Sequence, residues 1–202
     1  MGKSIDYIIV GSSFCDYQTW QLELLHWSIK KSGQTGKLVV LLSEDRSKKE
    51  TTNLNLPSDV DIVNLPDWAE EWDNKTNDSL SWGGIPNKYE SVSWLCDKNY
   101  FNNSDVLLFL DPDMIFVNKV NVIPKKNTII AQRWVGFNHS QHVDDFYNKR
   151  GCKIDPNHND AIMYPFIIRF DTLKKISKDY KNFCIEFGNE FKLWESEMFG
   201  LD

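Results

Sequence analysis

Two aspartates separated by one proline, Asp111-Pro112-Asp113, are the side chains whose spacing points most directly to chemistry. They follow residues 105–110, a largely apolar run that predicts a buried strand. Ligands of open α/β sheets bind beyond the carboxyl ends of strands, which is where this triplet should lie. Two carboxylates there repel each other unless a cation offsets their charge. Because Mg²⁺ and Mn²⁺ prefer oxygen ligands and commonly bridge carboxylates to a diphosphate, Asp111 and Asp113 predict a divalent-metal site.

A strand-ending turn is the alternative interpretation of the triplet, because proline and aspartate are both common in turns. Two aspartates spaced in this way also occur often by chance. The flanking residues favour the metal site, since apolar stretches lie on both sides of the triplet. We therefore expect residues 114–117 to be extended again, as a second apolar strand.

The composition indicates one globular domain. The chain has 202 residues, of which 41% are hydrophobic, and its eight Trp, seven Tyr and twelve Phe argue against disorder. A net charge of −6 argues against a broad nucleic-acid-binding surface. No apolar signal sequence and no run of 18 apolar residues occurs, so we expect a cytoplasmic protein without a membrane segment. The widely spaced cysteines suit reduced, mostly buried thiols: Cys15, Cys96, Cys152 and Cys184.

Apolar patterning in the first half of the chain predicts alternating strands and helices. Continuous apolar runs predict strands, and apolar residues at helical spacing predict helices, the first of them ending at Gly33. Such continuous runs are typical of a parallel sheet that is covered on both faces. The strands are expected at 5–10, 37–42, 60–63 and 105–110, and the helices at 16–31 and about 87–99.

The second half of the chain is less regular. Strands are expected at 128–131 and 166–170, and helices at 171–185 and 190–199. The polar stretches 66–86 and 134–160 are expected to be loops, and loops of that length are usually functional or mobile.

An apolar strand, an Asp-x-Asp triplet and a second apolar strand together resemble the metal-binding signature of GT-A-fold, nucleotide-sugar-dependent glycosyltransferases. The wider chain is similar to the peptidyl hydroxyproline arabinosyltransferases and serine galactosyltransferases of plants and algae. It differs from them in lacking a Gly-Gly-Phe-Thr-Arg segment and in having Lys88 where arginine is usual. The segments that carry the resemblance are 17–31, 87–95, 111–120, Ile154-Asp155-Pro156, 165–168 and 197–200.

The resemblance implies an α/β, GT-A-like and Rossmann-like fold with a mostly parallel sheet flanked by helices. Residues 1–202 would form one such domain. Residues 1–118 would be its nucleotide-sugar-binding half, and residues 119–202 an abbreviated acceptor-side half. The enzymes of that group continue into a region that commonly supplies a metal-ligating histidine.

The resemblance also assigns roles to individual side chains. Asp113 would coordinate the metal directly, and Asp111 would contact it through water or hold the donor ribose. The metal would stabilise the departing diphosphate as a Lewis acid. The segment Gly11-Ser12-Ser13 would hold the nucleotide near a helix N-terminus, although an ordinary strand-to-helix turn is the alternative. Asn87 and Lys88 would bind the donor, and an exposed helix lysine is the alternative for Lys88.

Further candidates lie in less regular sequence. Glu195 or Glu197 would act as a base or orient the acceptor, but side chains at i and i+2 point to different helix faces, so at most one can serve. A solvated helix face is the alternative for both. The candidates for a third metal ligand are His139, His142 and His158, and those for a sugar-stacking rim are Trp68, Trp72 and Trp82, with solvent exposure and core packing as the respective alternatives.

Together these features predict a glycosyltransferase. It would transfer a sugar from a nucleoside-diphosphate sugar, most simply a UDP-sugar, to a hydroxyl acceptor on a glycan or peptide, using Mn²⁺ or Mg²⁺. A non-catalytic nucleotide-sugar or glycan-binding module derived from a transferase is the alternative. A haloacid-dehalogenase-like phosphatase fits less well, because its Asp-x-Asp belongs on the first strand and is followed by Gly-Thr. Whether the sugar's configuration is retained or inverted stays open.

Overall fold

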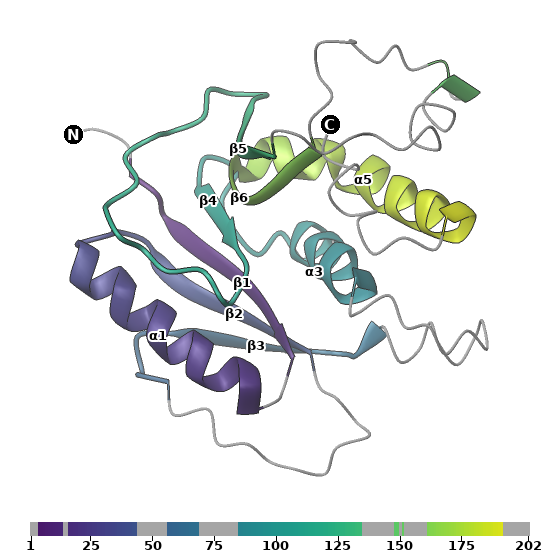
Figure 1. Ribbon diagram of the computed structural model, residues 1–202. Helices are drawn as coiled ribbons and strands as arrows, with labels where there is room; N and C mark the ends of the chain where they lie inside the picture. The colour runs from purple at the N-terminus through teal and green to yellow at the C-terminus, as the bar shows by residue number, and fades with distance from the viewer. Residues whose placement is uncertain are drawn as a thin grey trace.

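A six-stranded sheet is the centre of the part of the chain that the structure describes (Figure 1). The computed structural model describes residues 4–13, 16–43, 56–68, 85–134, 148–149, 151 and 161–191. The strand order is β3-β2-β1-β4-β6-β5. The strands are β1 Tyr7–Ser13, β2 Lys37–Ser43, β3 Asp61–Leu65, β4 Val106–Leu110, β5 Ile129–Trp134 and β6 Ala161–Arg169.

Most of the sheet is parallel. β1 pairs in parallel with both β2 and β4, and β2 pairs in parallel with β3, whereas β6 is antiparallel to β4 and to β5. The α/β fold with a mostly parallel sheet, predicted from the continuous apolar runs, is thereby confirmed. Because the chain first builds outward from β1 to β3 and then places β4 on the other side of β1, the strand order reverses between β1 and β4. Ligands of open α/β sheets bind at such a reversal.

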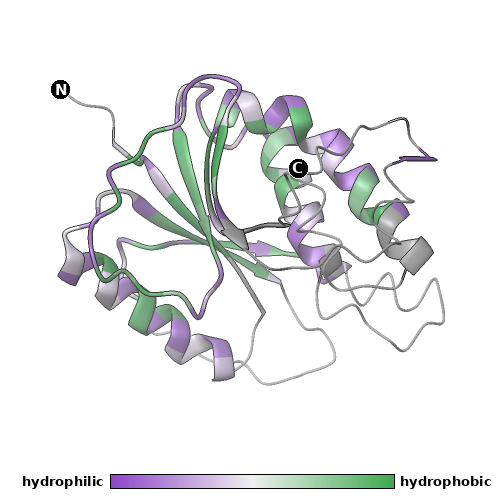
Figure 2. Cartoon of the chain, turned by 45° about the horizontal axis from the view of Figure 1, so that its top comes forward, coloured by the Kyte–Doolittle hydropathy of each residue, from purple (hydrophilic) through white to green (hydrophobic). Residues whose placement is uncertain are grey.

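Helices cover both faces of the sheet (Figure 1). Ile9, Val39 and Phe109 point to the face covered by α3 (Ile85–Asp97) and α5 (Phe170–Phe191). Ile8, Val40 and Leu108 point to the opposite face, which is covered by α1 (Asp16–Ser32). This alternation follows from the two-residue period of a strand, and full burial of each such side chain contributes about 1.5–3 kcal/mol. Figure 2 shows the hydrophobic residues concentrated in the strands at the centre.

The predicted end of α1 at Gly33 is confirmed. The Gly33 N–H donates to the Lys30 carbonyl at 3.2 Å, and the Gln34 N–H donates to the Ile29 carbonyl at 3.1 Å. Gly33 has a φ of +69°, the left-handed conformation that this helix-ending arrangement requires. Asn99 ends α3 in the same way, with a φ of 47°.

The expected strand at 114–117 was wrong. Residues 114–123 instead cross the face of the sheet next to α1, as an irregular segment (Figure 1). The Phe116 N–H donates to Ser28 Oγ at 3.0 Å, and the Val120 N–H donates to Gln34 Oε1 at 2.7 Å. The physical reason is that β1 and β6 already pair with β4 on both sides, and that backbone N–H groups of this segment bond to the Ser28 and Gln34 side chains instead of to a strand.

The remaining predicted strands and helices overlap elements of the structure where it describes them, although β6 begins at Ala161 rather than at 166. α3 begins two residues earlier than expected, at Ile85, and α5 continues past the expected end to Phe191. The helix expected at 190–199 does not begin as a separate element, because α5 runs without a break through residue 191. Residues 192–199 and most of the expected loops lie outside the described residues. Cys96 and Cys184 are buried thiols, as predicted, whereas Cys15 and Cys152 lie outside the described residues. Within the described ranges, no helix is both long and apolar enough to cross a membrane.

Candidate functional site

A polar cavity of about 290 Å³ lies at the carboxyl ends of β1, β2 and β4. It therefore coincides with the reversal of strand order, where a ligand site was expected. α1 and α3 contribute its remaining walls. The lining residues are Gly11, Ser12, Tyr17, Gln18, Gln21, Leu41, Ser43, Asn87, Lys88, Ser91, Asp111, Pro112 and Asp113.

The Asp111-Pro112-Asp113 triplet forms a turn, and both of its carboxylates line the cavity. The Met114 N–H donates to the Asp111 carbonyl at 3.2 Å, which closes the turn directly after β4. Asp111 is half-buried, whereas Asp113 is exposed. The turn interpretation and the site interpretation are therefore compatible, because the turn is what brings the two carboxylates to the same cavity.

Among the described residues that line this cavity, Lys88 carries the positive charge. Its Nζ lies 3.2 Å from Asp111 Oδ1 and 4.9 Å from the centre of the Tyr164 ring, on β6. About 31% of the Lys88 side chain and 29% of the Asp111 side chain are exposed to solvent. Lys88 is thus held toward the cavity rather than projecting as an exposed helix lysine. At this partial exposure the ion pair contributes only about 0–1 kcal/mol to stability, so its importance lies in where it fixes a positive charge.

The segment after β1 supplies polar groups on the other side of the cavity. Ser12 Oγ donates a hydrogen bond of 2.8 Å to Gln18 Oε1, which ties the end of β1 to the first turn of α1. A Cβ atom built on Gly11 would meet no other atom within 4 Å, so the backbone there borders open space. Gly11 and Ser12 thus line the cavity, and Ser13 ends β1 next to them. Their role in holding a nucleotide stays a prediction.

Asn87 lines the cavity, and its amide forms hydrogen bonds with two residues outside the lining. Its Nδ2 donates to Asp67 Oδ1 at 2.9 Å, and its Oδ1 accepts the Trp68 N–H at 2.7 Å. These bonds fasten the start of α3 to the chain that follows β3, and so they position Lys88, the next residue. Trp68 packs against the core beneath α3, in agreement with the core-packing alternative for this residue.

Five lining residues with polar side chains were not singled out from the sequence as binding residues. Tyr17, Gln18 and Gln21 come from the first turns of α1, while Ser43 ends β2 and Ser91 lies one turn after Lys88. The Tyr17 side chain is 66% exposed, and its ring lies edge-on to Trp20 at 6.0 Å. The sequence did indicate three of them. Tyr17, Gln18 and Gln21 are polar residues in the first turns of the helix after Gly11, and this end of the helix faces the carboxyl ends of the strands.

Several predicted site residues lie outside the described part of the chain. These are Glu195, Glu197, His139, His142, His158, Trp72 and Trp82. Their roles therefore stay predictions.

The donor set of the cavity fits a divalent cation that is shared with a phosphate ligand. Asp111 and Asp113 offer hard carboxylate oxygens, and Mg²⁺ is commonly held by one or two carboxylates together with substrate phosphates and water. No group of three or more His, Cys, Asp or Glu side chains suited to a metal ion occurs among the described residues. The fit is thus to a ligand-completed site rather than to a cage built from protein side chains alone.

Comparison with solved structures places this arrangement in a known fold. The sequence matches no protein-family profile and no curated protein. The galactosyltransferase LgtC, solved in complex with donor and acceptor sugar analogs, is similar in structure with a TM-score of 0.58 and 12% sequence identity, over 96% of this chain and 69% of that chain. An active-site mutant of LgtC gives a TM-score of 0.54 and 14% identity over the same shares. The chain therefore has a GT-A-like fold.

Proposed function

We propose that this protein is a glycosyltransferase that uses a nucleoside-diphosphate sugar as donor and a hydroxyl group as acceptor. One observation carries the proposal. Two carboxylates and one ammonium group, from Asp111, Asp113 and Lys88, share a cavity at the reversal of strand order. The fold supports it, because the similar galactosyltransferase was solved with donor and acceptor sugar analogs.

The nucleoside would occupy the side of the cavity that is formed by β1 and α1. The exposed Tyr17 ring offers a flat apolar face for a nucleobase, and such stacking needs no particular base. Gln18, Gln21 and the hydroxyl of Ser43 offer donors and acceptors for the ribose or the base. Gly11 lets the ligand approach the backbone, because no side chain intervenes there.

The diphosphate would lie beside the Lys88–Asp111 pair and Asp113. Mn²⁺ or Mg²⁺, held by Asp113 with support from Asp111, would supply Lewis-acid stabilisation of the leaving diphosphate. Lys88 would donate to a phosphate oxygen, with its charge already held in place by Asp111. In the transfer, the acceptor oxygen bonds to the anomeric carbon, and the bond from that carbon to the diphosphate breaks. The acceptor proton leaves to a base, for which Glu195 or Glu197 stays the prediction.

Release of nucleoside diphosphate tests this proposal. UDP-glucose and UDP-galactose would be incubated with the protein and Mn²⁺, with and without added sugar acceptors, and free UDP would be measured. We expect UDP release that EDTA abolishes, that Asp113→Ala lowers at least about tenfold, and that Asp179→Ala leaves unchanged. Asp179 is a matched control, because it is an exposed aspartate on α5 outside the cavity.

The same assay separates the alternatives. Metal-dependent UDP binding without UDP release from any donor would favour a non-catalytic nucleotide-sugar-binding module. Hydrolysis of p-nitrophenyl phosphate that is lost in Asp111→Asn would instead indicate a phosphatase and contradict the proposal.

A further inference from the structure

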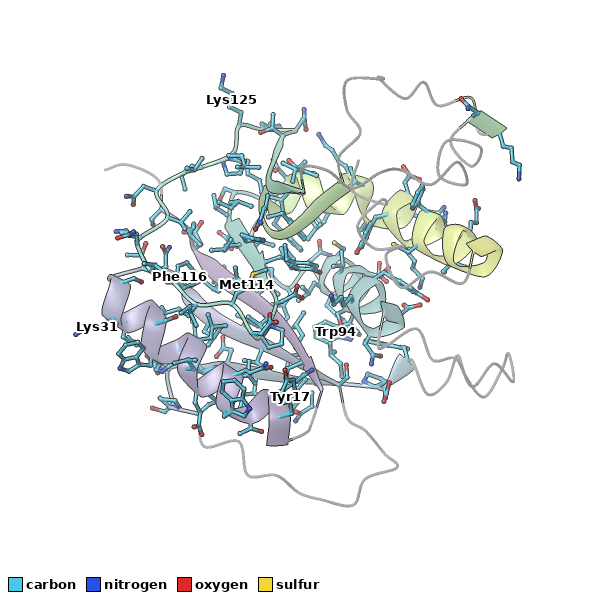
Figure 3. The ribbon with its side chains drawn as sticks, in the orientation of Figure 1. Tyr17, Lys31, Trp94, Met114, Phe116 and Lys125 are labelled. Carbon is cyan, nitrogen blue, oxygen red and sulfur yellow. The ribbon has the colours of Figure 1, made fainter. Side chains whose placement is uncertain are left out.

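A second cavity, of about 480 Å³, lies on the α1 face of the sheet. Its floor is formed by residues of β4, β5 and β6, and its wall by residues 114–122. Figure 3 labels Met114 and Phe116 on this segment, where it crosses the sheet next to α1. Among the described residues that line the cavity, only Asn118 and Gln132 carry polar side chains, and none carries a charge. We call it the apolar cavity.

The apolar cavity arises because an irregular segment, rather than a helix, covers this part of the sheet. Met114 and Phe116 pack into the core beneath the segment. Ile115, Val117 and Val122 also line the cavity, yet 53%, 79% and 52% of these residues is exposed to solvent. Its rim is therefore open to the outside. Because exposed apolar groups that gather around a cavity mark ligand or partner sites, this rim indicates a binding site.

The apolar cavity and the polar cavity lie on either side of the turn after β4. Leu110 and Met114 line the apolar cavity, whereas Asp111, Pro112 and Asp113, the three residues between them, line the polar one. The two cavities are therefore adjacent at this turn, so a polar and an apolar environment lie next to each other.

Two neighbouring residues of β6 also lie toward different cavities. Its pairing with β5 shifts register opposite Tyr164 and Pro165, which is the mark of a β-bulge. Tyr164 contacts Lys88 on the polar side, whereas Pro165 lines the apolar cavity.

We infer that the apolar cavity binds the hydrocarbon part of an amphiphilic acceptor, that is, an alkyl, acyl or prenyl chain whose hydroxyl end reaches the Asp111-Pro112-Asp113 turn. This inference rests on the proposed function, because it names the acceptor class of that site. The cavity volume lies within the range of about 300–1,000 Å³ that is typical of small-molecule sites. A free sugar is excluded as its occupant, since aliphatic walls would leave the sugar hydroxyls without hydrogen-bond partners.

Binding of two alkyl glucosides that differ only in chain length tests the inference. Octyl glucoside, kept below its micelle concentration, and methyl glucoside would be titrated into the full chain by calorimetry in the presence of UDP and Mn²⁺. Each buried CH₂ group contributes favourably, so we expect octyl glucoside to bind at least about tenfold more tightly. Val117→Asp, which places a charge at an exposed position of the rim, should reduce this preference to about threefold or less.

Two further variants and a separate measurement of UDP binding distinguish the possible outcomes. Ile62→Asp places the same charge on an exposed isoleucine of β3, outside the apolar cavity, and should keep the full preference. Ile130→Phe fills the cavity from its floor and should also reduce the preference. UDP binding, measured separately, should be unchanged in all three variants.

Two results would overturn the inference. Equal affinity for the two glucosides would show that the octyl chain does not lie in the apolar cavity. A preference for octyl glucoside that Val117→Asp and Ile130→Phe leave intact would show the same. A protein that prefers octyl glucoside but binds no UDP would contradict the proposed function. The hydrocarbon chain could then no longer be assigned to an acceptor of that reaction. Normal UDP binding without a preference for octyl glucoside would contradict this inference and leave the proposed function standing.

Discussion

The Nζ atom of Lys88 lies 3.2 Å from Oδ1 of Asp111. The two residues come from different elements, since Lys88 lies in the first turn of α3 and Asp111 directly follows β4. Their contact fixes a positive charge beside the carboxylates at the point where the strand order reverses. A diphosphate needs such a charge, and a carboxylate that already holds the ammonium in place reduces the entropy lost when the ligand binds.

Removal of this charge should weaken nucleotide binding. Lys88→Ala is expected to raise the Kd for UDP in the presence of Mn²⁺ about three- to tenfold, as loss of one partly exposed charge-assisted hydrogen bond implies. Calorimetric titration at two salt concentrations should also show a weaker salt dependence. Lys98→Ala, an exposed lysine just beyond α3, is the control. An unchanged Kd in Lys88→Ala would show that Lys88 does not contact the diphosphate.

Asn87 should support nucleotide binding by positioning Lys88 rather than by contacting the ligand. Asn87→Ala removes the two hydrogen bonds to Asp67 and Trp68, so we expect the free energy of unfolding to fall by about 1–3 kcal/mol. Urea denaturation measures this loss, with the exposed Asn121→Ala as a variant that should cost little. UDP binding by the folded Asn87→Ala protein should weaken less than in Lys88→Ala. If it weakens more at unchanged stability, Asn87 contacts the ligand directly.

Two glycines should respond in opposite ways to alanine. Gly33 has a φ of +69°, so Gly33→Ala should lower the free energy of unfolding by about 1–2 kcal/mol and leave UDP binding unchanged. A Cβ on Gly11 would meet no atom and Gly11 borders the polar cavity, so Gly11→Ala should keep its stability and bind UDP more weakly. Thermal unfolding and UDP titration of both variants measure the contrast. Loss of stability in Gly11→Ala alone would contradict it.

The thiol of Cys96 should react slowly at neutral pH. Burial raises the pKa of Cys96 to about 11, despite the opposing effect of a hydrogen bond with Ser177. Because the thiolate is the reactive form, alkylation by iodoacetamide should stay slow at pH 8 and accelerate as the pH rises toward that value. Mass spectrometry of modified peptides measures the rate, and the urea-unfolded chain is the control. Equal rates in the folded and unfolded chain at pH 8 would contradict the buried position of Cys96.

The parts of the fold that depend on local sequence could be predicted. The runs that became β1, β2 and β4 are continuously apolar because both of their faces are covered, and Gly33 ends α1 through its own backbone conformation. The Asp111-Pro112-Asp113 triplet could be placed at the carboxyl end of a sheet strand for the same reason, since it directly follows a buried apolar run.

The parts that depend on distant partners could not be predicted. Residues 114–117 look like a strand, but the Phe116 N–H bonds to the side chain of Ser28, which lies 88 residues earlier in the chain, instead of to a neighbouring strand. Asn87 looks like a ligand contact, but its amide partners lie about 20 residues earlier in the chain. Tyr17 joins the cavity only because α1 packs beside the end of β1.

Metal-dependent nucleotide binding is the central claim, and one titration tests it most directly. UDP would be titrated into the wild-type chain, Asp113→Ala and Asp179→Ala, each with and without Mn²⁺, with the change in tryptophan fluorescence as the readout. We predict that Mn²⁺ tightens UDP binding in the wild type and in Asp179→Ala, and that Asp113→Ala loses most of this enhancement. UDP binding that is absent, or that Mn²⁺ and Asp113→Ala leave unaffected, would contradict the account.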